Sequence, residues 1–221
     1  MASVFRDITK DVCKGIDATL QADYGFKPIQ AGRKMSTQKA LTNSRQLFIS
    51  FELIDLGVHA TILTFINLFD KTLIDAAQCD STVTDPVRKS AFLSNNIFWI
   101  VGKSAEAGIE LKPENRSEER ARRLLKTLRP AIETYEAWCT TDQTLFDSLS
   151  NESMAGRIDF LIERRTRAVV SLGMKLGKQL DALRFLADRG VAALPATPAG
   201  HLVADRIRSF MTKVSECYFG V

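Results

Sequence analysis

The chain has 221 residues, of which 45% are hydrophobic and 25% charged, so it is apolar enough to fold and is not expected to be disordered. Six prolines and twelve glycines are few for a protein of many short strands, and long periodic segments predict one all-α domain over residues 1–221, a helical bundle. Four widely spaced cysteines and two histidines exclude the common zinc spacings, so we expect no metal and no cofactor.

The N-terminal segment, residues 1–28, is predicted to form a helix followed by a turn. The helix covers residues 3–22, and Gly25 and Pro28 supply the turn chemistry. The first residues lack an uninterrupted apolar core and carry acidic side chains, so we expect neither a secretory signal nor a transit peptide. Reduced, cytosol-facing thiols follow from this interpretation.

Two blocks of opposite charge come next. The segment from Tyr24 to Phe51 holds five bases and no acid, a local charge of +5, whereas Glu52 to Asp85 holds six acids and one base, a local charge of −5. The net charge of +4 for the whole chain averages over these blocks, although each sets up its own local field. The basic block therefore predicts an anionic partner.

Residues 33–78 are predicted to form a basic amphipathic helix that runs into an apolar helix. Within residues 37–51, apolar and small side chains recur at the i, i+3, i+4, i+7 spacing of an amphipathic helix. Such a helix binds an anionic membrane, with apolar side chains at the acyl boundary and bases among the headgroups. The alternative is a bundle helix whose apolar stripe faces a protein core. The predicted membrane-binding residues are Arg33, Lys34, Lys39, Leu41, Arg45, Phe48 and Phe51.

The most apolar segment, residues 47–69, is long enough in principle to cross a bilayer. Glu52, Asp55 and His59 interrupt it at i, i+3 and i+7, and charged residues near the centre of a membrane helix are costly. We interpret the segment as a mostly buried helix with one polar face. A lipid-embedded hairpin, which would leave the bundle partly in the membrane, is the alternative.

The rest of the chain is predicted to form two further helical pairs. The central pair covers residues 86–139, and the C-terminal pair covers residues 154–221, with a proline-containing linker at 192–200. Gly173 and Gly177 form a GxxxG pattern in the C-terminal pair. This spacing favours close approach of a neighbouring helix, and a protein core explains it better than a membrane does.

The motifs of common enzyme classes are missing from the sequence. It contains no nucleotide-binding glycine loop, no HExxH helix and no GxSxG elbow, so we do not expect an enzyme. Arg164, Arg165 and Arg167 lie beside Glu163 and are predicted to form a solvated helix face. In an alternative interpretation, these arginines and the basic block bind the phosphates of a nucleic acid.

The order of several motifs resembles that of the peroxin-11 family of peroxisomal membrane proteins. Residues 41–48, LTNSRQLF, are similar to the family's basic amphipathic helix, and residues 95–104, NNIFWIVGKS, resemble its Asn-Asn, apolar, Trp stretch. Residues 124–129, LLKTLR, followed by Tyr135 and Glu136, resemble its next basic helix. The length is similar to that of the compact members, including glycosomal proteins of kinetoplastids. The C-terminal residues 201–221 depart from the family because they are too charged for a membrane span.

This resemblance implies a function at the peroxisomal or glycosomal membrane. A family member would promote membrane curvature, elongation, fission and proliferation of the organelle through its amphipathic helix and through homo-oligomer formation. Its implied partners are an anionic lipid membrane, further copies of the chain and the organelle-division machinery. The alternatives are an all-α nucleic-acid-binding protein and a helical protein-interaction scaffold.

Overall fold

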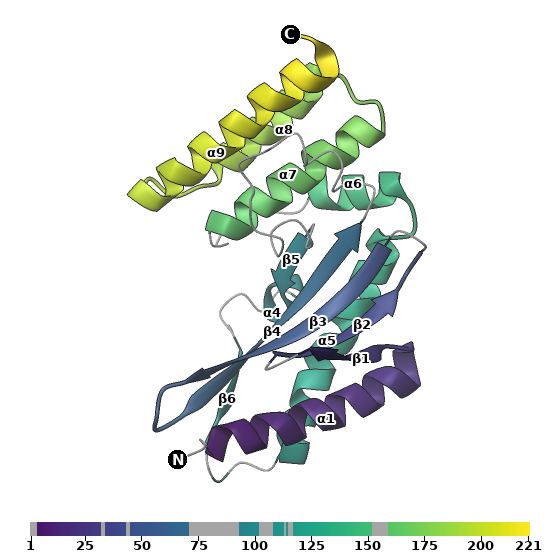
Figure 1. Cartoon of the computed structure of the whole chain (residues 1–221), viewed down its shortest axis with the longest axis vertical. Helices are drawn as coiled ribbons and strands as arrows, with labels where there is room; N and C mark the ends of the chain where they lie inside the picture. Colours follow the sequence, from purple (N-terminus) through teal and green to yellow (C-terminus); the bar gives the residue numbers. More distant parts are fainter. Residues whose placement is uncertain are drawn as a thin grey trace. The chain divides into compact units, whose positions relative to one another are not determined.

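The computed structural model describes residues 4–31, 34–42, 45–70, 93–101, 108–112, 114, 117–151 and 159–221. It has a mixed α/β fold, so the predicted all-α bundle is wrong (Figure 1). The chain divides into two compact units where one domain was predicted. The first unit comprises Met1–Asn67 and Asn95–Glu136, and the second comprises Leu68–Ser94 and Ala137–Val221.

The part of the chain that the structure describes contains a six-stranded sheet. Strands β1 (Lys27–Ala31), β2 (Lys34–Ala40), β3 (Arg45–Asp55), β4 (Ala60–Asp70) and β5 (Leu93–Asn96) neighbour one another in that order, and β6 (Ile109–Leu111) pairs with β4. The pairs β1–β2, β2–β3 and β4–β6 are antiparallel. Thr37 of β2 lies between Pro28 of β1 and Ile49 of β3, and Thr61 of β4 lies opposite Glu110 of β6.

Strands β2, β3 and β4 replace the long helix predicted for residues 33–78; residues 71–78 lie outside the described residues. In β3, Leu47, Ile49 and Phe51 are buried and alternate with less buried residues, which is the period of a strand. In β4, every second residue from Ala60 is buried and the others are half-buried, so both faces of this strand are largely covered. The amphipathic helix predicted for residues 37–51 is therefore wrong, because the side chains of β3 alternate with the two-residue period of a strand.

The central segment, predicted as a helical pair over residues 86–139, is also only partly helical. Strand β5, the short helix α4 (Ile97–Ile100) and β6 occupy the described residues of its first half. Residues 86–92 and 102–107 lie outside the described residues. The second half contains helix α5 (Ser117–Trp138), which continues through Pro130.

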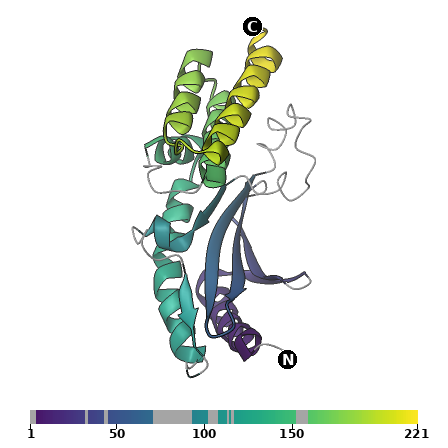
Figure 2. The ribbon, with the colours of Figure 1, turned by 90° about the vertical axis from the view of Figure 1, so that its left-hand side faces the viewer.

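Helix α1 (Val4–Tyr24) of the first unit lies where the sequence pattern places a helix. It ends at Gly25, whose φ of 69° is readily adopted by glycine, and the N–H of Phe26 donates to the carbonyl of Leu20 at 3.2 Å. Helix α1 packs on β1, β2 and β3 and approaches α5, where Gly15 faces Ala121. Figures 1 and 2 show α5 running alongside the sheet.

Polar contacts tie α5 to the other elements of the first unit. A guanidinium nitrogen of Arg129 lies 2.8 Å from a carboxylate oxygen of Asp23 in α1. The side-chain amide of Asn95 in β5 donates to the hydroxyl of Tyr135 at 2.6 Å, and both residues are buried. A buried hydrogen bond of this kind is costly to break, so it fixes α5 against β5.

Asp17 of α1 gives the first unit a pH-dependent stability. Its Oδ1 is enclosed, with no hydrogen-bond partner among the described residues, and desolvation raises the pKa of this carboxyl from 3.8 to about 6. Because the folded-state pKa is the higher one, the stabilisation linked to Asp17 is complete below pH 3.8 and is lost as the pH rises toward 6. The carboxylate at neutral pH therefore destabilises the folded state.

We predict that Asp17→Asn stabilises the first unit at neutral pH, because it removes this desolvated charge. Discounted for the partial exposure of the side chain, the gain in unfolding free energy is about 1 kcal/mol near pH 7.5 and disappears near pH 4. Urea denaturation at both pH values measures it. Asp11→Asn, on the exposed face of the same helix, is the matched control and should show no such pH-dependent gain. Equal effects of Asp17→Asn at both pH values would contradict the prediction.

The second unit contains a group of packed helices, α6 (Asp142–Asn151), α7 (Asp159–Lys175), α8 (Leu180–Ala192) and α9 (Pro198–Val214), followed by the π-helical turn η1 (Ser215–Phe219). The pair predicted for residues 154–221 is thus three helices, with residues 154–158 outside the described residues. The extra break comes at Gly177, which has a φ of 70°. The N–H of Lys178 donates to the carbonyl of Gly173 at 2.9 Å, a C-terminal helix cap.

Helices α7, α8 and α9 enclose one apolar core. Its buried residues are Val170, Leu183, Ala187, Val203, Ile207, Phe210, Met211 and Val214. The two glycines of the GxxxG pattern have different roles: Gly173 packs against Leu183 and Phe146, whereas Gly177 ends α7. The predicted linker at 192–200 is shorter than expected, because α9 begins at Pro198.

Candidate interaction site at the β3–β4 hairpin

The described members of the predicted membrane-binding set lie on strands and a turn in place of one helix face. Lys34 and Lys39 belong to β2, and Arg45, Phe48 and Phe51 belong to β3; Leu41 follows β2, and Arg33 lies outside the described residues. Arg45 and Phe51 are buried, and Leu41 and Phe48 are half-buried. The Nζ of Lys39 forms an ion pair with Glu136 of α5. Arg45, Phe51 and the half-buried members therefore do not share one exposed face.

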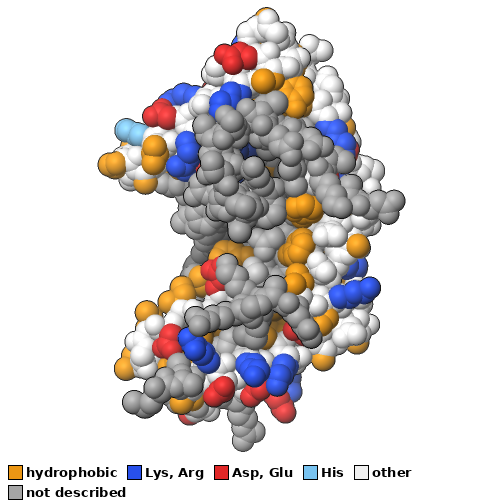
Figure 3. Space-filling model, in the orientation of Figure 1, with side chains coloured by type: hydrophobic (Ala, Val, Ile, Leu, Met, Phe, Trp, Pro, Cys, Tyr) orange, Lys and Arg blue, Asp and Glu red, His pale blue; other side chains and the backbone are white. Residues whose placement is uncertain are grey.

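The β3–β4 hairpin instead exposes apolar side chains at its tip. Ile54 is 44% exposed, Leu56 58% and Val58 81%, although side chains of this size are usually buried. We call Ile54, Leu56 and Val58 the hairpin tip. Hydrophobic side chains also line the lower-left margin of Figure 3, the region where Figure 1 places the end of this hairpin. Exposed apolar clusters of this kind mark sites of interaction.

The turn that carries the hairpin tip has a defined geometry. The N–H of Leu56 donates to the carbonyl of His59 at 3.0 Å, and the N–H of Gly57 donates to Oδ1 of Asp55 at 3.0 Å. Gly57 has a φ of 86°, a conformation that favours glycine. Asp55 thus accepts a hydrogen bond within the turn and stabilises its conformation.

The strands below the turn are fixed by neighbouring elements. Ala60 and Ile62 of β4 pair with Leu111 and Ile109 of β6, and all four side chains are buried. Gly108, just before β6, lies so close to β4 that a Cβ there would be 2.5 Å from the carbonyl oxygen of Ile62. The packed strands beneath the turn therefore hold the hairpin tip in place. This lowers the conformational entropy that the tip loses when it binds a partner.

The charged residues next to the hairpin turn in the sequence are acidic, whereas the exposed Lys112 follows Leu111, the β6 partner of Ala60. Glu52 and Asp55 are exposed beside the tip, and the sequence has no lysine or arginine between Arg45 and Lys71. Attachment to an anionic membrane surface gains energy from bases close to the apolar side chains. The composition of the tip therefore favours a partner with apolar and basic groups over an anionic lipid surface.

The arginines predicted to form a solvated face have internal contacts. Arg165 is fully buried, and its Nε donates to the carbonyl of Leu149 at 3.1 Å, so the prediction is wrong for this residue. Arg167 lies 3.1 Å from the carboxylate of Glu163 and 5.0 Å from the ring centroid of Phe210. Both side chains therefore contribute to packing within the second unit.

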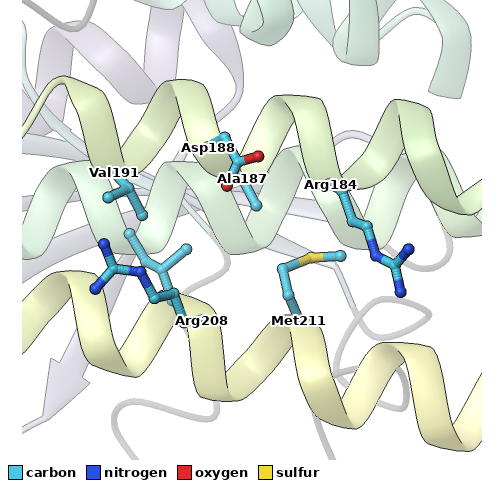
Figure 4. Close-up of a pocket in the computed structure, with 7 residues that line it drawn as sticks. Arg184, Ala187, Asp188, Val191, Arg208 and Met211 are labelled. Carbon is cyan, nitrogen blue, oxygen red and sulfur yellow. The ribbon is translucent and has the colours of Figure 1, made fainter.

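A shallow pocket lies between α8 and α9 of the second unit (Figure 4). Its volume is about 130 Å³, and its lining residues are Arg184, Ala187, Asp188, Val191, Ile207, Arg208 and Met211. Figure 4 shows the two arginines toward opposite ends, with Ala187 and Met211 between them. The pocket thus combines an apolar floor with two cationic groups and one carboxylate, that of Asp188.

Comparison with family models, curated proteins and solved structures finds no match to this chain. The resemblance to the peroxin-11 family and the peroxisomal or glycosomal location stay predictions. Among the described helices, none is both long and apolar enough to cross a bilayer. The described residues also contain no group of three or more side chains suited to hold a metal ion.

Sequence reasoning missed the hairpin tip because it assigned residues 47–69 to one helix. A signal was present in Asp55, Leu56 and Gly57, since an aspartate two residues before a glycine is typical of a tight turn. The flanking segments are rich in β-branched and aromatic residues taken together, which also favour strands. The exposure of Leu56 and Val58 has no such signal, because it depends on which elements pack nearby.

Proposed function

We propose that the chain is a protein-interaction module that binds a partner protein through its hairpin tip. The observation that supports this proposal is the exposure of three apolar side chains around one turn. The strand that follows this turn, β4, is held in place by its pairing with β6. Binding covers these side chains, and removal of their apolar surface from water supplies the driving force. This corresponds to the scaffold alternative, placed on a hairpin where a helix bundle was expected.

The membrane-curvature function lacks the element that was expected to perform it. It depended on an amphipathic helix over residues 33–51, and the described residues of that segment form β2, the first part of β3 and a bend after β2. The hairpin offers no replacement for the basic helix, because the sequence has no lysine or arginine between Arg45 and Lys71. A protein partner is therefore the function that the geometry supports best.

A photo-crosslinking residue at position 56 of the full-length chain tests this function in cells. We expect discrete protein adducts from position 56, and we expect Val58→Asp to reduce them at least tenfold, because a carboxylate would be buried at the interface. Val4→Asp, which changes another exposed valine in the same unit, is the matched control and should leave the adducts unchanged.

Two further measurements make this test decisive. A crosslinking residue at the exposed Lys10 of α1 gives the background of chance collisions. Adducts from position 56 that do not exceed this background, or that survive Val58→Asp, would contradict the proposal. Flotation of the purified chain with anionic vesicles, lost in Val58→Asp, would instead assign the tip to lipid.

A further inference from the structure

We draw no further inference here: the strongest candidate, the shallow pocket between α8 and α9, carries nothing because its two arginines are paired with carboxylates of their own helices and nothing among the described residues shows what covers it.

Discussion

Replacing Glu163 by alanine should loosen α7 from α9 and lower the unfolding free energy of the second unit by about 2–3 kcal/mol. The Oε2 of Glu163 accepts hydrogen bonds from Nε and Nη2 of Arg206 at 2.9 and 2.7 Å, and its Oε1 lies 3.1 Å from Nη2 of Arg167. The Glu163 side chain is only 14% exposed, so solvent screens these contacts poorly. Its removal leaves two guanidinium groups that repel each other across the helix interface.

Hydrogen exchange of the full chain measures this effect locally, because it reports on peptides of α7 and α9 separately from the first unit. Asp205→Asn is the matched control, since it removes a carboxylate that pairs with Arg208 on the surface and should cost under about 0.5 kcal/mol. A double-mutant cycle with Arg206→Ala should show a coupling of at least about 1 kcal/mol. Unchanged exchange in α7 and α9 after Glu163→Ala would show that the ion pair contributes nothing.

The helices that could be predicted from the sequence are those with a polar face. Helix α1 buries Val12, Ile16 and Leu20 at helical spacing and exposes charged residues between them, so its period is unambiguous. Helix α5 has the same property, with Leu124, Leu128 and Ile132 buried. In both helices, the charged residues mark the solvent-exposed face, so the helical period can be recognised in the sequence.

The sheet could not be predicted in the same way because β4 has almost no polar face. Residues such as Ile62, Leu63 and Ile66 are apolar on both sides of the strand, and a continuous apolar run fits a buried helix as well as a buried strand. The basic residues of β2 and β3 lie outside the apolar stripe when the segment is interpreted as a helix. They therefore gave it the apparent polar face of an amphipathic helix. Their contacts are set by tertiary structure: Lys39 meets Glu136, which is 97 residues away in the sequence.

The candidate site shows a different limit of sequence reasoning. The turn at Gly57 could have been found from its residues, but the pocket lies between α8 and α9, which are joined through residues 193–197 and pack on each other. Arg184 and Arg208 come to line one pocket only after α8 and α9 pack together. A single sequence gives no measure of that packing, so the pocket follows from the structure alone.

Gly190→Ala should destabilise the second unit by about 1–2 kcal/mol, although alanine is the better helix former by about 1 kcal/mol. A Cβ at Gly190 would lie 2.1 Å from Oγ1 and 2.8 Å from Cγ2 of the buried Thr166 on α7. Thr166 cannot turn away freely, because its hydroxyl donates to the carbonyl of Ile162 at 2.8 Å. The helices α7 and α8 must therefore separate to admit the methyl group.

A second substitution and a matched glycine test this mechanism by the same exchange measurement. Thr166→Ala removes both clashing atoms, so the double variant should recover at least half of the loss caused by Gly190→Ala. Gly15→Ala is the control: its Cβ would lie 3.6 Å from that of Ala121, an ordinary contact, and the substitution should stabilise α1 by up to about 1 kcal/mol. If Gly190→Ala and Gly15→Ala stabilised their helices equally, the close approach of α7 and α8 at Gly190 would be wrong, because only helix propensity would then distinguish glycine from alanine at either position.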